Sequence, residues 1–330
     1  MLELFQTMRL PALAALTMAP VHAVFGLHIV RRGVIFIDLA VAQVAALGMA
    51  FALARGVEPD SPTAYWSAVS AALFGAFLIS LTRFRLGRVP HEAMIGIVFV
   101  VASAGSIIVL QYADHGQEML KTLLDGQILL VSDRSVVEHT ALVYGLILAG
   151  VALLWRPIRR ISEGEPNAPR GFGLVFYDFA FYALLGFVVA SSVKIAGVLV
   201  VFTWLVMPAV VATMWVERLT PSLLIAVPIG WVGSIVGMYV SLKADPELGG
   251  WPTGASIVVT FGAIVFANYL VRVLIPEGRK SHLAASRVSE EPSRLTPSAH
   301  PPIPNAAHDG HEEDGHAADA KREEHRRDNR

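Results

Sequence analysis

Residues 195–215 read IAGVLVVFTWLVMPAVVATMW, an apolar stretch without a charged side chain. A helix needs roughly 20 consecutive apolar residues to cross the hydrocarbon core of a bilayer. In lipid the backbone has no water with which to form hydrogen bonds, so such a stretch must be a helix rather than an open strand. The sequence therefore predicts a membrane-spanning helix at this position.

Eight further stretches of this kind occur along the chain. They lie at 10–30, 33–54, 64–81, 92–111, 136–155, 174–193, 222–241 and 253–275. The first has no small-residue cleavage pattern before Arg31 and Arg32 and is followed at once by another span, so we interpret it as a span rather than a signal peptide. The junctions at 31–32 and 194 are so short that a pair of spans there can also be one broken or re-entrant element. The predicted fold class is an all-α polytopic membrane protein, a bundle of about 8–9 transmembrane helices.

The charge distribution divides the chain in two. Apolar residues make up 54% of it and charged residues 16%, against about a quarter charged in an ordinary globular protein. Twenty of the charged side chains lie in residues 276–330, which are also rich in Pro and Ser. Such a segment cannot bury a core. We expect a transmembrane permease domain at 1–275 and a disordered, His-rich cytoplasmic tail at 276–330.

Charged loop residues predict the orientation. The loops at 31–32, 82–91, 156–173 and 216–221 carry ten arginines, whereas the alternate loops carry five basic residues and most of the loop acids. Basic loops stay in the cytoplasm. The C-terminus is therefore expected in the cytoplasm and, with nine spans, the N-terminus outside.

Several function classes are excluded. The chain has no cysteine, so it has no disulfide framework and no thiolate metal site. A net charge of −1 gives no case for nucleic-acid binding. The sequence lacks a phosphate-binding P-loop and the motifs of metalloproteases and serine hydrolases. We expect a non-enzymatic protein without a permanent cofactor, and any ATP hydrolysis must occur on a separate chain.

Polar side chains inside the spans are the candidates for function, because an ionised group near the bilayer centre costs roughly 2.5–3.5 kcal/mol. Asp38 and Gln43 offer oxygen donors for a divalent cation, and His22 and His28 offer nitrogen donors. Each has an alternative. Asp38 lies within two turns of the arginine pair and can form an ion pair there, and a histidine on an apolar helix is more often packed and hydrogen-bonded. Asp178 is expected at a helix end or at the interface.

The tail ends in a run of imidazoles and carboxylates. The histidines are His308, His311, His316 and His325. This composition is typical of a loose Zn²⁺ binder. A merely solubilising tail is the alternative.

Three motifs resemble the permeases of bacterial zinc/manganese ABC importers. The first is VFGLHIVRR at 24–32 with FIDLA at 36–40 and LGMA at 47–50. The second is EAMIGIVF at 92–99, and the third is VKIAGVLVV at 193–201 leading to MPAVVA at 207–212. The resemblance covers about residues 10–275 and includes the order of the spans.

The resemblance implies a permease subunit of the bacterial inner membrane that imports a divalent metal, zinc first, with manganese or iron as alternatives. Two copies form the pore, a separate ABC ATPase drives it, and an extracytoplasmic metal-binding protein delivers the ion. Within the loop at 156–173, where a short interfacial helix is expected, one segment is loosely similar to the family's ATPase-docking segment. Its residues are Glu165, Pro166, Ala168, Arg170 and Gly171.

One departure concerns the metal ligands. The family has a histidine four residues after the aspartate, and Ala42 stands there in this chain. Gln43 follows, but five residues of α-helix turn by about 500°, which leaves Asp38 and Gln43 about 140° apart. Either the helix is distorted or this chain uses a different ligand set.

Two other classes of function stay open. A self-powered secondary carrier or channel for metal cations would use Asp38 and the histidines as a relay and need no ATPase. A membrane scaffold with a metal-sensing tail would leave Asp38 without a role.

Overall fold

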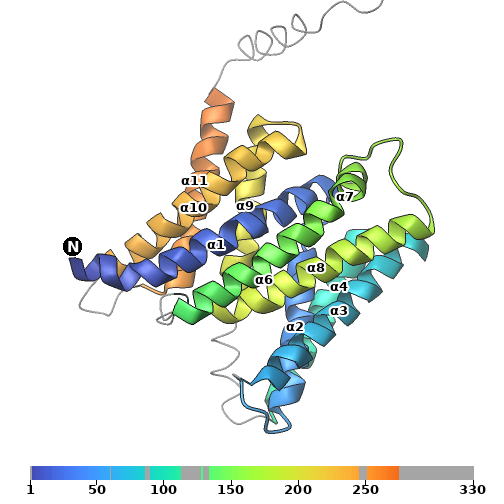
Figure 1. Ribbon diagram of the computed structural model, residues 1–330, viewed down its shortest axis with the longest axis horizontal. Helices are drawn as coiled ribbons and strands as arrows, with labels where there is room; N and C mark the ends of the chain where they lie inside the picture. The colour runs from blue at the N-terminus through green and yellow to red at the C-terminus, as the bar shows by residue number, and fades with distance from the viewer. Residues whose placement is uncertain are drawn as a thin grey trace, which may run out of the picture. The chain divides into compact units, whose positions relative to one another are not determined.

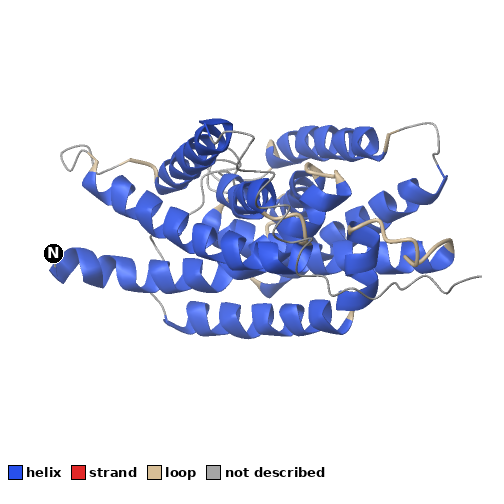
Figure 2. Cartoon of the chain, turned by 90° about the horizontal axis from the view of Figure 1, so that it is seen from above, coloured by secondary structure: helices blue, strands red, loops and turns tan. Residues whose placement is uncertain are grey.

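The computed structural model describes residues 2–59, 61–85, 90–112, 128, 134–244 and 251–274. Within these ranges the secondary structure is helical, without a β-strand (Figures 1 and 2). The helices are α1 (Leu2–Arg32), α2 (Ile37–Leu53), α3 (Pro62–Arg85), α4 (His91–Leu110), α6 (Arg134–Leu153), α7 (Trp155–Ser162), α8 (Phe172–Ala196), α9 (Val198–Trp215), α10 (Leu219–Lys243) and α11 (Thr253–Leu274).

The predicted all-helical membrane fold is confirmed. Each of the nine predicted spans corresponds to one helix. Seven of the described helices are long and apolar enough to cross a membrane, and α6 with α7, bent by 73° at their junction, is an eighth candidate. Helix α2 is apolar but only 17 residues long. The orientation of the bundle stays a prediction.

Backbone contacts divide the chain into Met1–Ile275 and Pro276–Arg330. The second unit lies outside the described residues, and so do the four tail histidines proposed as metal ligands. The domain assignment and the tail therefore stay predictions.

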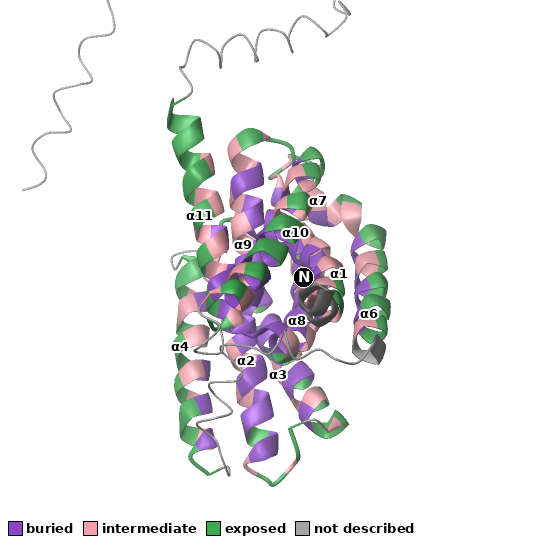
Figure 3. Cartoon of the chain, turned by 90° about the vertical axis from the view of Figure 1, so that its left-hand side faces the viewer, coloured by how far each residue is buried: buried purple, intermediate pink, exposed green. Residues whose placement is uncertain are grey.

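Two sets of helices make up the described bundle. Helix α1 packs against α9, α10 and α6, and α10 and α9 both pack against α11. Helix α2 packs against α3 and α4, and α8 joins the two sets because it contacts α3, α2, α6 and α9 (Figure 1). The burial colours in Figure 3 show α2 largely purple, whereas α4, α6 and α11 carry long green faces.

The exposed faces are apolar, as expected for a protein surrounded by lipid. Large side chains that are more than half exposed occur on α3, α4, α6, α10 and α11: Phe74, Val101, Leu146, Leu224 and Phe266. In water such a surface would be an aggregation liability. In a bilayer it is the ordinary outer face of a helix bundle.

Glycine permits two features of this packing. At Gly26 on α1, a Cβ atom would overlap the backbone carbonyl of Leu205 on α9, so only glycine allows this close approach. At Gly197, φ is +80°, a conformation that other residues rarely adopt, and the chain breaks there between α8 and α9. The short junction near 194 is therefore a break between two separate helices.

Candidate functional site

Asp38 is a buried carboxylate near the start of α2. It is the second residue of the helix and only 2% exposed. Neither of its oxygens accepts a well-formed hydrogen bond from a described residue. Its polar surroundings are the backbone N–H groups of Leu39 and of Asp38 itself, in a first turn where such groups lack helix partners. A buried carboxyl group in this position has lost its water and gained little in return, so its negative charge is costly unless a cation or a proton offsets it.

Gln43 does not join Asp38 in a common site. Helix α2 is continuous from Ile37 to Leu53, so it is not distorted between the two residues. Gln43 is half-buried and lies about 140° around the helix from Asp38. Of the two explanations for the missing histidine at position 42, the structure favours a different ligand set over a distorted helix.

The arginine pair at the end of α1 has other partners. The Arg32 guanidinium donates from Nη1 to Asp178 Oδ1 at 2.8 Å, and the two side chains are 0% and 1% exposed. Arg31 donates to the backbone oxygen of Val216 at 3.1 Å. An ion pair between Asp38 and these arginines is therefore absent from the described contacts. Asp178 lies near the start of α8, which agrees with a position towards a helix end, and it is buried in an ion pair with Arg32.

His22 is a packed and hydrogen-bonded residue. Its Nδ1 donates to the carbonyl oxygen of Met18 at 2.8 Å, and its Nε2 lies 3.0 Å from the hydroxyl of Ser192. The same hydroxyl contacts the Tyr144 phenol, and the Trp204 ring lies against the imidazole with centroids 5.4 Å apart. Both ring nitrogens already have protein partners.

His28 has one nitrogen bound and one without a partner. Ser162 donates its proton to the carbonyl of Ile158 at 2.9 Å, so its oxygen accepts from His28 Nδ1, 2.8 Å away. The opposite nitrogen, Nε2, is buried without a hydrogen-bond partner. Since Nδ1 carries the hydrogen, the neutral ring leaves a lone pair on Nε2. However, the guanidinium of Arg32, which also donates to Ser162 at 2.8 Å, is a cation close to this imidazole.

The four candidates for the transport path do not form a ready metal site. Among the described residues, no three His, Asp or Glu side chains lie close enough together to hold an ion. Of the four, Asp38 is the one acidic side chain, and its oxygens have no hydrogen-bond partner among the described residues. The described residues therefore offer one carboxyl group, and not a complete ligand set, along this part of the bundle.

A second feature lies at the short helix α7, which follows α6 at a bend of 73°. Its Ile158 and Ile161 are buried, whereas Arg156 and Arg160 are exposed, so the helix is amphipathic. This placement is typical of a helix that lies along the membrane surface. It agrees with the short interfacial helix expected in this segment.

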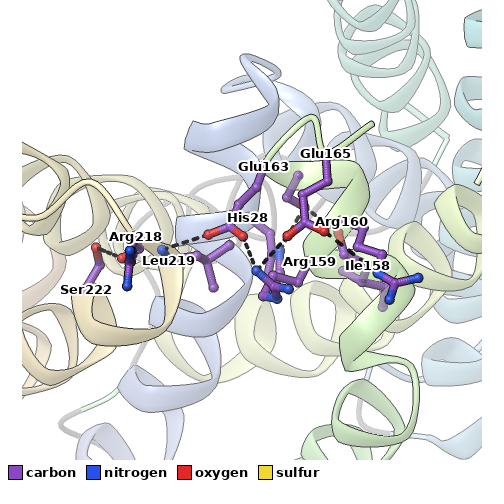
Figure 4. Close-up of polar contacts among 10 residues, drawn as sticks. His28, Ile158, Arg159, Arg160, Glu163, Glu165, Arg218, Leu219 and Ser222 are labelled. Carbon is purple, nitrogen blue, oxygen red and sulfur yellow. Dashed lines mark hydrogen bonds and ion pairs between the residues drawn. The ribbon is translucent and has the colours of Figure 1, made fainter. Parts of the chain in front are cut away.

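The predicted ATPase-docking residues follow α7 directly. Glu165 pairs with Arg159 at 2.8 Å and with Arg160 at 3.8 Å (Figure 4). Its carbonyl accepts from the N–H of Ala168 at 2.9 Å. These contacts fold the segment back onto α7. The exposed members of the predicted set are Pro166, Arg170 and Gly171, whereas Glu165 and Ala168 are half-buried.

Two residues next to this segment make contacts between helices that the sequence did not predict. Ser162 connects α7 to α1, and Glu163 connects α7 to α10 through a hydrogen bond from the Leu219 N–H at 3.1 Å. Their partners are 130 and 56 positions away in the chain. No local pattern in the sequence signals such pairs.

The fold and these two features define a class. Many apolar helices, a buried carboxylate without a partner and an amphipathic surface helix are together typical of a membrane transport protein. They do not identify what is transported.

Comparison with known proteins gives the family. The ABC 3 transport family matches residues 4–272. The manganese transport system membrane protein MntC of Listeria monocytogenes is 24% identical over 257 residues, 77% of this chain and 89% of that protein. The chelated iron transport system membrane protein YfeC of Yersinia pestis is 27% identical over 222 residues, 66% of this chain and 70% of that protein. The chain belongs to the ABC 3 transport family, and the resemblance seen in the sequence is confirmed at this level.

A solved structure shares the fold. A chain of PsaBC from Streptococcus pneumoniae in complex with Fab matches with a TM-score of 0.66 and 19% identity, over 84% of this chain and 95% of that one. The similarity extends over nearly the whole of the solved chain.

Proposed function

We propose that this protein is the permease subunit of an ABC importer for a divalent metal ion in the bacterial inner membrane. The observation that carries the proposal is Asp38, a buried carboxyl group with no partner among the described residues, on a helix in the interior of the bundle. Membership of the ABC 3 transport family supports it. Asp38 is the transient contact of the ion during alternating access.

Manganese or iron is the favoured substrate, ahead of zinc. The site offers a carboxylate, and the amide of Gln43 on another face, but no histidine at position 42. Oxygen donors suit Mn²⁺ better than Zn²⁺, which prefers nitrogen and sulfur. The relatives described above are named for manganese or chelated iron. The sequence-based preference for zinc has no such support.

The partners follow from what the chain lacks. It contains no P-loop, so ATP is hydrolysed by a separate ABC ATPase subunit. We infer that the segment 165–171, together with the arginine-rich face of α7, docks on that ATPase and that the C-terminus is cytoplasmic. A second copy of the permease completes the pore, and an extracytoplasmic binding protein delivers the metal.

Substitution of Asp38 tests the proposal. Reconstituted with its ATPase and binding protein in vesicles, the wild-type permease should take up ⁵⁴Mn²⁺ only when ATP is present. Asp38→Asn keeps the size of the side chain and removes its charge, so uptake should be abolished while the protein still inserts and assembles. Glu58→Gln, the same chemical change on an exposed loop residue, is the matched control and should transport normally.

Two results would contradict the proposal. Normal uptake by Asp38→Asn would remove this carboxylate from the path. Uptake that needs an ion gradient but no ATP would favour the self-powered carrier.

A further inference from the structure

The C-terminal end of α7 is tied to two different parts of the bundle through two consecutive residues. Ser162 is the last residue of α7, and Glu163 follows it as the C-cap. The side chain of Ser162 contacts α1. The side chain of Glu163 contacts the start of α10 (Figure 4).

The Ser162 connection is buried and carries charge. Its hydroxyl accepts hydrogen bonds from Arg32 Nε and His28 Nδ1, both at 2.8 Å. Arg32 in turn pairs with Asp178 on α8 and stacks on Phe181, with its guanidinium carbon 4.1 Å from the ring centroid. This connection is rigid, because separating it would leave two buried donors, Arg32 Nε and His28 Nδ1, without an acceptor.

The Glu163 connection is of another kind. Its Oε1 accepts from the backbone N–H of Leu219, the first residue of α10, and the other oxygen pairs with Arg159 on α7. The first N–H groups of a helix have no partner within the helix and carry partial positive charge. Arg218, at the N-cap of α10, makes no side-chain cap hydrogen bond. Glu163 therefore caps α10 from a distant part of the chain.

The end of α1 completes the junction. Arg31 donates to the carbonyl of Val216, and the hydroxyl of Ser222 on α10, which donates to the Arg218 carbonyl at 2.8 Å, lies 3.2 Å from the same Val216 oxygen. Among the hydrogen bonds and ion pairs of the described residues, Ser162 links α7 to α1 and, through Arg32, to α8, and the carboxylate of Glu163 links the end of α7 to α10.

We propose that Glu163 is a positioning residue that makes α10 move with α7. The inference rests on the proposed function, in which the motion of the ATPase enters the permease at α7. The rigid contact at Ser162 carries that motion to α1 and α8. The Glu163 cap carries it to α10, which packs on α11, α9 and α1.

The first test examines the link without any partner. The chain has no cysteine, so two introduced thiols are the only ones that take spin labels. Labels at Arg156→Cys on α7 and Thr220→Cys on α10, both exposed positions, report the distance between these helices in the full chain in lipid nanodiscs. With Glu163 present, we expect a single narrow distribution of distances between the two labels, and Glu163→Ala should broaden it. Glu217→Gln removes an exposed carboxylate two residues before α10 and should leave the distance narrow. An unchanged distribution in Glu163→Ala would overturn the proposal.

The second test measures coupling in the complete complex with its ATPase. Glu163→Ala should lower the number of metal ions moved per ATP hydrolysed by roughly tenfold, the worth of a hydrogen bond to a charged group, while the ATPase still co-purifies with the permease. Glu163→Gln keeps an acceptor without the charge and should fall between Glu163→Ala and wild type. Glu217→Gln should match wild type.

The outcomes separate the two proposals. An unchanged ratio in Glu163→Ala, or loss of the ATPase from the complex, would overturn the positioning role. If wild type shows no ATP-dependent metal uptake at all, the proposed function fails, and the label distances still decide whether Glu163 holds α10 to α7.

Discussion

Asp38 and Asp178 are both buried aspartates near the start of an apolar helix, yet their surroundings differ. Arg32 lies 2.8 Å from Asp178, whereas no described cation or side-chain donor contacts Asp38. A buried charge with a partner, such as that of Asp178, has a structural role. An unpaired one is costly, and its position inside a transport protein suggests that a substrate supplies the missing charge.

The Asp178 pair should be structural. Asp178→Asn leaves the Arg32 guanidinium buried without its counter-charge, which should destabilise the protein by about 3–5 kcal/mol. Thermal unfolding in detergent measures the loss. The double variant Arg32→Met with Asp178→Leu removes both charges and should recover most of the stability. A melting temperature of Asp178→Asn equal to that of wild type would contradict this account.

The sequence identifies Asp38 as a candidate functional residue but does not indicate whether it forms an ion pair. Arg31 and Arg32 were the nearest cations along the chain, so an ion pair with Asp38 was a reasonable alternative. The partner of Arg32 is 146 residues away, on a helix whose position depends on packing. A sequence pattern indicates contacts between residues within about two helical turns of each other, but not contacts between residues that are far apart along the chain.

At the scale of elements, hydropathy alone predicted nine helices in order, because the bilayer fixes both their length and their hydrogen bonding. The bend between α6 and α7 was harder to place. The predicted span ended at 155, whereas α7 begins at Trp155 with an amphipathic pattern that a search for apolar stretches does not detect.

Close approach of α1 and α9 gives a prediction for one glycine. Gly26→Ala places a methyl group onto the carbonyl of Leu205, and a backbone atom cannot move aside as a flexible side chain can. We expect a loss of about 1–3 kcal/mol or more from overpacking, seen as a lower melting temperature.

Gly145→Ala on α6 is the matched control, because its added methyl group meets nothing within 4 Å. It should be neutral or stabilise the helix by up to about 1 kcal/mol. Equal melting temperatures for the two variants would mean that the α1–α9 contact does not depend on glycine.

At the scale of the whole molecule, the chain combines a membrane bundle with a charged, histidine-bearing C-terminal segment. The bundle matches its family over residues 4–272, so the segment beyond it is an addition to the common fold. An addition of this kind should modify transport rather than perform it.

Deletion of residues 282–330 tests this expectation. The composition of this segment predicts disorder, in which case its histidines bind metal loosely. The shortened protein should then transport at the wild-type rate but respond differently to high internal metal. Uptake of ⁵⁴Mn²⁺ at low and high internal Mn²⁺ measures the difference. Loss of all transport despite normal membrane levels would show that the segment belongs to the transport machinery.

The short length of α2, together with its burial, determines how bilayer thickness acts on this helix. Seventeen residues span about 26 Å, a little less than the roughly 30 Å of bilayer hydrocarbon. Most of α2 is covered by other helices, so a thicker or thinner bilayer does not act on it directly. Hydrophobic mismatch falls instead on the outer helices such as α11, which can tilt to meet it. A change in lipid composition that alters bilayer thickness should therefore have little direct effect on the position of the helix that carries Asp38.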